Sequence, residues 1–423
     1  MSRLYHLVIL FIEAMQPLVS NVHKIAVLRA NALGDLIMTL PALDALKAAY
    51  PQAEITLLAG PWHAEFLAGR PGPVSRVVVI PPLHHIDQPT LTPELQAELD
   101  AFFRRMQAER FDLAVQLHGG GKQSNPFVLG LGARLTVGLK TPDAAPLDRW
   151  IPYLYYQREI LRYLEVVSLV GAQPTRLDPH LAVTARDLRE SRHVVPETER
   201  RLLVLHPGAS DPRRRWPAES FAQLGDRLAE TGTQVVVTGV EHEADVCAAV
   251  VEGMRAEAVN ACGRLSLSGL TGLLARAAVV VSNDTGPRHL AEAVGTPTVG
   301  IYWCGNVINA GPATAARHRT ALSWRLNCPV CGFDCTLGRC PHDDSFVADV
   351  TVDEVTELAL GLFAHALNSF DQATSAPISV GASRMRVPPL PAGEGVRFST
   401  RSATKSGGRD GRRRAGRRRA AAG

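Results

Sequence analysis

The stretch from Ala277 to Tyr302 constrains the fold more than any other part of this sequence. Residues 278–282 form a short apolar run rich in valine, which is typical of a strand buried on both faces of a sheet. The sequence Asn-Asp-Thr-Gly-Pro then interrupts the run and begins a helix, which we expect to continue to about Val294. A second strand follows over residues 297–302. The stretch therefore predicts a βαβ unit with a polar loop at the carboxyl end of its first strand.

The loop of this unit is suited to bind a phosphate group. Backbone N–H groups at a helix N-terminus are free, and the helix dipole attracts an anion. An ordinary crossover needs a strand and a helix, but it has no use for an acid, a hydroxyl, a glycine and a histidine together. We therefore predict that a phosphate-type ligand binds at Asp284, Thr285, Gly286 and His289.

Composition and charge limit the class of protein. A chain of 423 residues with 46% hydrophobic residues and alternating strand and helix patterns predicts an α/β protein of two domains and a tail. Residues 401–423 carry nine basic residues and one acid, a local charge of +8. Because the whole chain is at +4, residues 1–400 carry −4, so no basic surface for nucleic acid is expected. Seven cysteines are too few for a secreted disulfide scaffold, and a reducing cytoplasm is the expected compartment.

The order of predicted elements divides the chain into an N-terminal extension (1–21), two α/β domains (22–184 and 200–368) and a basic tail (371–423). A polar segment of poor periodicity, about Thr184 to Glu199, is predicted to be a linker. The apolar residues Leu4 to Ile12 are too few to span a bilayer; they are expected to be an upstream extension, with a membrane-surface segment as the alternative. The tail is rich in Pro, Gly, Ser and Arg, and we predict that it is disordered.

Further candidate residues follow other strands. Asp35 begins the first long helix, where it is either a helix cap or a carboxylate facing a cleft between the domains. Ser210 and Arg214 follow the first strand of the second half and suit a diphosphate, although a solvated basic loop is the alternative. Glu243 is placed either to hold a ribose hydroxyl or to cap a helix. The loop before Asp35 lacks the G-x-G-x-x-G fingerprint, which counts against a nicotinamide enzyme.

Four stretches carry a resemblance to a known family: RANALGDLIMTLPALDALKAAYPQAEITLL, LHPGASDPRRRWPAESFAQL, VVVTGVEHEAD and VVSNDTGPRHLAEAVGTPTVGIY. In this order, over roughly residues 22–365, the chain resembles glycosyltransferase family 9, which contains the ADP-heptose:lipopolysaccharide heptosyltransferases of Gram-negative bacteria. The resemblance implies a GT-B fold: two Rossmann-like domains facing a cleft, with the acceptor bound by the first and the nucleotide-sugar donor by the second.

The resemblance also implies residue roles. Asp35 becomes the catalytic base, Arg214 a contact to the donor diphosphate and Glu243 a contact to the nucleoside, while residues 284–289 complete the donor site. Some members of the family carry a lysine before the Trp-Pro, where this chain has arginine, which preserves the charge. No D-x-D pair follows a strand to hold Mg²⁺, so a metal-independent inverting transfer is expected, with no cofactor required.

The expected partners are ADP-heptose and a lipid-linked saccharide acceptor at the inner face of the inner membrane, where the basic tail could contact anionic lipid. Two other functions are compatible with the sequence. One is a nucleotide-sugar epimerase or hydrolase of the same fold, and the other is a binding protein that does not catalyse a reaction.

A cysteine cluster lies downstream of these motifs. Its spacing is C-x2-C-x3-C-x4-C-x-H, and it consists of Cys328, Cys331, Cys335, Cys340 and His342. The first pair has the spacing of zinc ligands. A structural zinc site, a redox-sensitive disulfide clip and unpaired thiols are the alternatives. A catalytic role is not expected, because the cluster follows the donor motifs.

Overall fold

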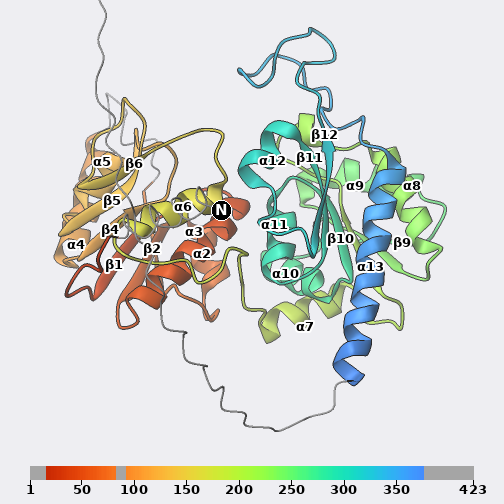
Figure 1. Cartoon of the computed structure of the whole chain (residues 1–423), viewed down its shortest axis with the longest axis horizontal. Coiled ribbons are helices and arrows are strands. Elements are labelled where there is room, and N and C mark those ends of the chain that lie inside the picture. The colour runs from red at the N-terminus through yellow and green to blue at the C-terminus, as the bar shows by residue number, and fades with distance from the viewer. Residues whose placement is uncertain (1–15, 82–91, 376–423) are drawn as a thin grey trace, which may run out of the picture. The chain divides into compact units, whose positions relative to one another are not determined.

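The computed structural model describes residues 16–81 and 92–375, with the backbone alone described from residue 365 (Figure 1). The predicted apolar segment at Leu4–Ile12 and almost all of the predicted tail lie outside these residues. Within them, no helix is both long and apolar enough to cross a membrane.

The first half of the chain alternates strands and helices as predicted. Its elements are β1 (Lys24–Leu28), α2 (Leu33–Ala49), β2 (Glu54–Ala59), α3 (Pro61–Leu67), β3 (Arg76–Val79), α4 (Pro93–Ala108), β4 (Leu113–Gln116), α5 (Ser124–Gly130), β5 (Leu135–Lys140), β6 (Arg149–Pro152) and α6 (Glu159–Ser168). All pairings are parallel, and the strand order is β3-β2-β1-β4-β5-β6.

The second half repeats this topology. Its elements are α7 (Ala185–Val194), β7 (Leu202–His206), the short 3₁₀ turn η2 (Pro212–Arg214), α8 (Ala218–Ala229), β8 (Gln234–Val237), the turn η3 (Glu241–Glu243), α9 (Ala244–Gly253), β9 (Ala258–Asn260), α10 (Leu267–Arg276), β10 (Val279–Asn283), α11 (Gly286–Ala293), β11 (Thr298–Trp303), α12 (Cys304–Ala310), β12 (His318–Ser323) and α13 (Val352–Ser375). The order β12-β11-β10-β7-β8-β9 is again parallel throughout.

In both sheets the order of strand addition therefore reverses at equivalent places, between β1 and β4 and between β7 and β10. Ligands of open α/β sheets bind at the carboxyl ends of the strands beside such a switch point. Asp35 follows β1, and the polar loop Asp284–Gly286 follows β10. The loop that contains Arg213–Arg215, called the arginine loop below, follows β7. The topology thus directs the predicted site residues to the ligand-binding edge of each sheet.

The central βαβ unit forms as its sequence predicts. All five residues of β10 are buried, as expected for a valine-rich strand inside a parallel sheet. The helix α11 starts after Thr285 with a proline in its first turn, and Gly295 follows its end with a φ of 82°. This positive φ is a conformation that glycine adopts without steric cost.

The predicted linker is wrong in one respect, because residues 185–194 form the helix α7. Thr184 and Asp187 form a capping box at its start, and Asp187 is fully buried in an ion pair with Arg70 (Nη1–Oδ2 2.7 Å and Nη2–Oδ1 3.0 Å). The buried positions of this helix are Asp187, Ser191 and Val194. Because two of them are polar, the sequence shows no apolar helical period.

The last helix, α13, is also longer than predicted. The apolar pattern indicated an end near Phe363, whereas the helix continues to Ser375 and so includes the first residues of the segment assigned to the tail.

Hydrophobic residues connect the two halves. One cluster of buried side chains runs from α2 in the first half, through Leu36, Ile37 and Leu40, to Leu290 and Ala291 of α11 in the second. A backbone hydrogen bond from Leu181 N–H to the Ala293 carbonyl (2.9 Å) adds to this contact. The N-terminal turns of α2 and α11 therefore meet.

Candidate active site

A cavity of about 1000 Å³ lies among the loops at the carboxyl ends of the strands of both sheets. Every site residue predicted from the sequence outside the cysteine cluster lines this cavity: Asp35, Ser210, Arg214, Glu243, Asp284, Thr285, Gly286 and His289. Their placement together is a finding of the structure, while their individual roles remain predictions.

Two glycines allow the N-termini of α2 and α11 to touch. A Cβ added at Gly34 would lie 2.9 Å from Cδ2 of His289, and one added at Gly286 would lie 3.0 Å from Cβ of Leu33. Real Cβ atoms do not approach their neighbours this closely without displacing them. The close approach places Asp35, one residue after Gly34, beside the polar loop of the second half.

Asp35 has two partners near the cavity. Its Oδ1 accepts a hydrogen bond from Nη2 of Arg29 (2.6 Å), and its Oδ2 accepts one from the backbone N–H of Ala32 (3.1 Å). The second bond is the helix-capping contact that the sequence left open. Since 29% of the side chain is exposed, the carboxylate can cap the helix and still meet a ligand in the cavity.

Two histidines, the buried His63 and the half-buried His118, lie near this ion pair. Burial lowers the pKa of His63 and of His118 to about 4 each, and the positive charge of Arg29 acts in the same direction. Both imidazoles are therefore neutral at neutral pH, and Nδ1 of His118 accepts a hydrogen bond from the backbone N–H of Ala30 (3.2 Å). Neither histidine lines the cavity.

Asp284 is the centre of a network in the second half. Its Oδ2 accepts hydrogen bonds from Nη1 of Arg214 (3.1 Å) and from Nδ2 of Asn306 (2.7 Å), and its Oδ1 lies 3.5 Å from Nε2 of His289. Nη2 of Arg214 also donates to Oγ of Ser210 (2.9 Å). The network fixes the arginine side chain at the wall of the cavity.

The charge of Asp284 is secured by these partners. Burial alone would raise the pKa of its carboxyl, but the hydrogen bond from His289, together with Arg214 and Asn306, lowers the pKa to about 2. A depressed carboxyl pKa contributes stability above the ordinary pKa of the group, and that contribution is lost as the pH falls through the lowered value. The network therefore persists through the neutral range and weakens only as the pH approaches 2.

The ring nitrogens of His289 both face groups of the protein. Nη2 of Arg288 lies 2.8 Å from Nδ1 of His289, and because a guanidinium only donates, Nδ1 is the acceptor. Nε2 then carries the proton and faces Asp284. Arg288 itself is fully buried and pairs with Glu292 (2.8 Å), which holds the whole arrangement on one face of α11.

Glu243 realises the capping alternative of the sequence, because its Oε2 accepts a hydrogen bond from the backbone N–H of Val240 (3.0 Å). The carboxylate also packs on Gly208 so closely that a Cβ there would lie 2.0 Å from Oε1. His206 lies 3.9 Å from Oε2, and burial lowers the pKa of this histidine despite the nearby acid. Glu243 is thus both a cap and a residue of the cavity wall.

Several residues of the site carried no sequence signal that we used. Asn283 accepts a hydrogen bond from Trp216 N–H (3.0 Å) and donates one to the Pro207 carbonyl (2.7 Å), so it ties the arginine loop to β10. Its position next to Asp284 could have indicated this role. The remaining ones are cavity-lining residues whose positions depend on tertiary contacts: Trp62, Tyr155, Tyr156, Glu159 and Asn306.

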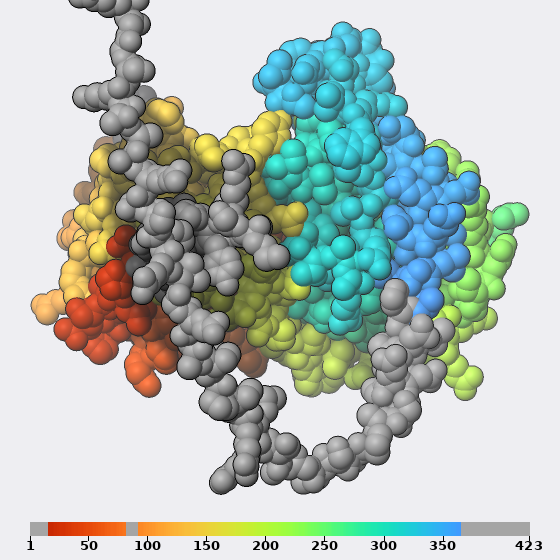
Figure 2. All heavy atoms as spheres, viewed as in Figure 1, coloured from red at the N-terminus to blue at the C-terminus, as the bar shows by residue number. Residues whose placement is uncertain are grey.

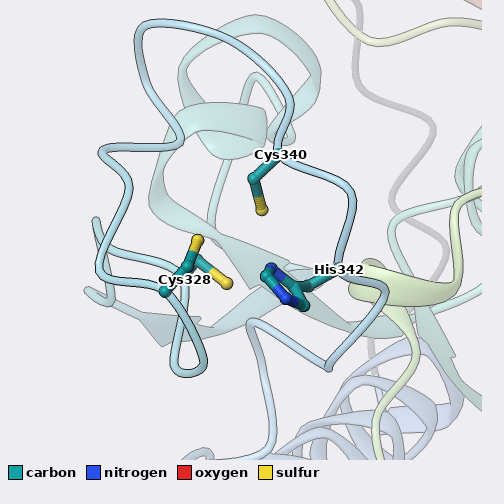
Figure 3. A group of neighbouring side chains, drawn as sticks. Cys328, Cys340 and His342 are labelled. Carbon is teal, nitrogen blue, oxygen red and sulfur yellow. The ribbon is translucent and has the colours of Figure 1, made fainter.

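A second group of side chains lies in the segment between β12 and α13. The thiols of Cys328, Cys331 and Cys340 and a ring nitrogen of His342 all lie within 4.8 Å of one another. Figure 3 labels Cys328, Cys340 and His342 of this group. The cluster predicted from the sequence also included Cys335, whose thiol does not belong to this group. The thiol of Cys335 instead donates to the Phe333 carbonyl (3.4 Å), and His342 completes the group.

Comparison with known proteins identifies the class of fold first. The chain superposes on the structure of E. coli ADP-heptose lps heptosyltransferase II with a TM-score of 0.64 at 21% identity, over 81% of this chain and 99% of that one. It also superposes on E. coli heptosyltransferase WaaC with ADP, with a TM-score of 0.60 at 20% identity, over 80% and 99% of the two chains. The predicted GT-B fold is confirmed.

The sequence then identifies the family. The model of glycosyltransferase family 9 (heptosyltransferase) matches residues 99–330, more than half of the chain. Lipopolysaccharide heptosyltransferase 2 of Escherichia coli (strain K12) is 28% identical over 300 residues, which cover 66% of this chain and 82% of that protein. The chain belongs to glycosyltransferase family 9 and is a glycosyltransferase.

Proposed function

We propose that this enzyme transfers a heptose from ADP-heptose to a saccharide acceptor of the lipopolysaccharide core, with inversion at the anomeric carbon. The observation that carries the proposal is the contact of Gly34 with His289, because it brings a carboxylate of the first half to the polar loop of the second. Similarity to a lipopolysaccharide heptosyltransferase and to a heptosyltransferase solved with ADP supports the choice of donor and acceptor.

The proposed reaction assigns one task to each half. An acceptor hydroxyl attacks the anomeric carbon, and Asp35 removes the proton of this hydroxyl as the new C–O bond forms. The bond from the anomeric carbon to the diphosphate oxygen breaks, and ADP leaves with an additional negative charge. Arg214 and the first turn of α11 stabilise that charge. No metal ion takes part in this scheme.

The network around Asp284 refines the donor-site roles. A carboxylate repels a diphosphate, and the partners of Asp284 are Arg214, Asn306 and His289. We therefore assign Asp284, His289 and Ser210 to positioning Arg214 and the α11 turn, and we assign direct contact with the diphosphate to the Arg214 side chain and the backbone of that turn. Glu243 remains the proposed contact to the nucleoside.

The first half is proposed to bind the acceptor. Trp62, Tyr155 and Tyr156 offer aromatic surfaces at this side of the cavity, and Glu159 offers an acid. Ligand sites typically combine such apolar walls with a few polar groups that fix orientation. The second half, residues 200–368, is proposed to bind the donor.

The decisive experiment incubates the protein with ADP-heptose, with and without a truncated lipopolysaccharide acceptor, and follows both sugar products and ADP. We expect release of ADP and extension of the acceptor only when both substrates are present. Conversion of the donor alone would establish the epimerase or hydrolase alternative. Binding of the donor without turnover of either substrate would establish a binding protein.

The contact between α2 and α11 makes a separate prediction. We expect Gly34→Ala to lower kcat roughly tenfold, because an added methyl group pushes the His289 ring away and separates the base from the donor. Gly72→Ala is the matched control, since a Cβ at Gly72 meets no atom within 4 Å. Steady-state rates of both variants check this. Wild-type turnover by Gly34→Ala would mean that the contact is not needed.

The basic tail is proposed to add contact with anionic lipid at the inner face of the membrane. Because α13 continues to Ser375, the truncation removes residues 376–423. We expect unchanged activity on a water-soluble acceptor and weaker sedimentation with anionic vesicles at low salt, since each basic residue near such a surface contributes about 1 kcal/mol. Equal, salt-insensitive vesicle binding by both proteins would contradict the membrane role.

A further inference from the structure

The group formed by Cys328, Cys331, Cys340 and His342 has the composition of a closed tetrahedral metal site. Three thiols and one imidazole are a common ligand set for structural Zn²⁺. With metal–ligand distances of about 2.0–2.3 Å, the ligand atoms of such a site lie roughly 3.5–4 Å apart. The group, all within 4.8 Å, therefore needs only a small contraction to close around an ion.

His342 supplies an independent indication of a ligand. Its Nδ1 is buried and has no hydrogen-bond partner among the residues that the structure describes. A buried polar atom left unpaired costs free energy, and native proteins rarely tolerate one. A metal ion bound at this nitrogen would supply the missing partner. Figure 3 shows the imidazole ring of His342 beside the side chains of Cys328 and Cys340.

The segment that carries these residues contains little regular secondary structure. Between Ser323, where β12 ends, and Val352, where α13 begins, the structure describes no helix or strand and only one isolated β-bridge, from Asn327 to Asp334. Large apolar side chains of the segment remain exposed: Trp324 at 73%, Val330 at 57% and Leu337 at 81%. It projects from the second half as the blue region above β12 in Figures 1 and 2. Cys328, Cys340 and Phe346 are buried in the core of the second half, but the stretches between them are mostly exposed, and a metal cross-link would stabilise those stretches.

We propose that Cys328, Cys331, Cys340 and His342 bind one Zn²⁺, and that this ion braces the arginine loop of the donor site. The bracing part rests on the function proposed above. The ion is structural and takes no part in sugar transfer. Cys335, which interrupts the ligand run in the sequence, is not a ligand.

The residues that follow His342 connect the two features. The backbone N–H of Phe346 donates to the Arg213 carbonyl (2.7 Å), and Oγ of Ser345 donates to the Arg215 carbonyl (2.6 Å). The guanidinium of Arg213 also lies over the Phe346 ring, 5.0 Å from its centre. These contacts hold both neighbours of Arg214. An ion bound by the three thiols and His342 therefore holds residues 345–346 in place, and these residues in turn hold the loop that carries Arg214.

The first test measures bound metal in the purified, reduced protein. We expect about one zinc per chain in the wild type and in Cys335→Ser, and loss of nearly all zinc in Cys331→Ser and His342→Ala. Cys335→Ser is the matched control because it removes a thiol of the same segment. Circular dichroism verifies that each variant folds. The number of zinc ions per wild-type chain tests the site even if a variant does not fold.

Several outcomes would overturn this site. They are a wild-type protein that neither contains nor takes up zinc, iron in place of zinc, a disulfide between Cys328 and Cys331 in protein kept reduced, and equal zinc loss in Cys335→Ser and His342→Ala. None of these outcomes depends on the enzyme's substrate.

The second test measures ADP binding by calorimetry before and after zinc is removed with a chelator. We expect the affinity to fall about fivefold or more, the usual range for coupled sites. In Arg214→Ala the same treatment should change the affinity much less, because the braced side chain is gone. Zinc removal that leaves ADP affinity unchanged would overturn the bracing. If ADP does not bind the wild type at all, the proposed function fails while the zinc content still stands.

Discussion

Asp35→Asn is expected to lower kcat by about a hundredfold or more, the lower range for the loss of a general base. The substitution keeps the size of the side chain and an oxygen that can accept the hydrogen bond from Ala32 N–H. It removes the charge that pairs with Arg29 and the capacity to take a proton from the acceptor hydroxyl. Steady-state kinetics with saturating donor and acceptor measure the effect.

The control for this variant is Asp44→Asn on the same helix. Asp44 lies 3.7 Å from Nε of Arg176 and does not line the cavity, so its kcat should stay near that of the wild type. ADP affinity should be little changed in either variant, because Asp35 belongs to the acceptor half and is assigned no contact to the nucleotide. A folded Asp35→Asn protein with near-normal kcat would remove Asp35 from the mechanism.

Arg214→Ala is expected to weaken ADP binding roughly tenfold to a hundredfold, because a hydrogen bond to a charged group contributes about 1.5–3 kcal/mol. The side chain is fixed by Asp284 and Ser210 at the wall of the cavity. Calorimetric titration with ADP measures the loss. The ADP affinity of Arg214→Lys should lie between those of the wild type and Arg214→Ala, since lysine keeps the charge but lacks the planar guanidinium group.

Arg227→Ala controls for the loss of one positive charge from the second half. Arg227 pairs with Asp353 at the surface and does not line the cavity, and exposed ion pairs contribute little to stability. His289→Ala should also weaken ADP binding, by less than Arg214→Ala, because it acts through Asp284. Wild-type affinity in both Arg214→Ala and His289→Ala would place the diphosphate elsewhere.

The elements that the sequence predicted best are those whose signal is local. The strand β10 is a valine run buried throughout, and α11 begins after its N-cap Thr285 and is followed by Gly295, as the residue types predicted. These features depend on backbone preferences and on burial within a few residues of each other. For the same reason the polar loop at Asp284–Gly286 was recognised as the centre of the site.

The segment that the sequence assigned differently is a helix whose buried residues are largely polar. The helix α7 buries Asp187 against Arg70, more than a hundred positions away in the chain, so no apolar period marked it as a helix. Spacing alone did not show which members of the cysteine cluster lie together, because Cys335 and His342 both follow Cys331 closely in the chain and only the fold of the segment brings His342 beside the three thiols.

The sequence by itself determined the fold class, the family and the residue types of the site, because each depends on short motifs at strand ends. Only the tertiary structure decided how they act together. Gly34 and Gly286 let two helix N-termini touch, and that contact places Asp35 beside the donor loop. Arg214 and Asp284, far apart in the chain, become partners because β7 and β10 are neighbours in the sheet. Such contacts depend on the packing of distant segments, which no local pattern records.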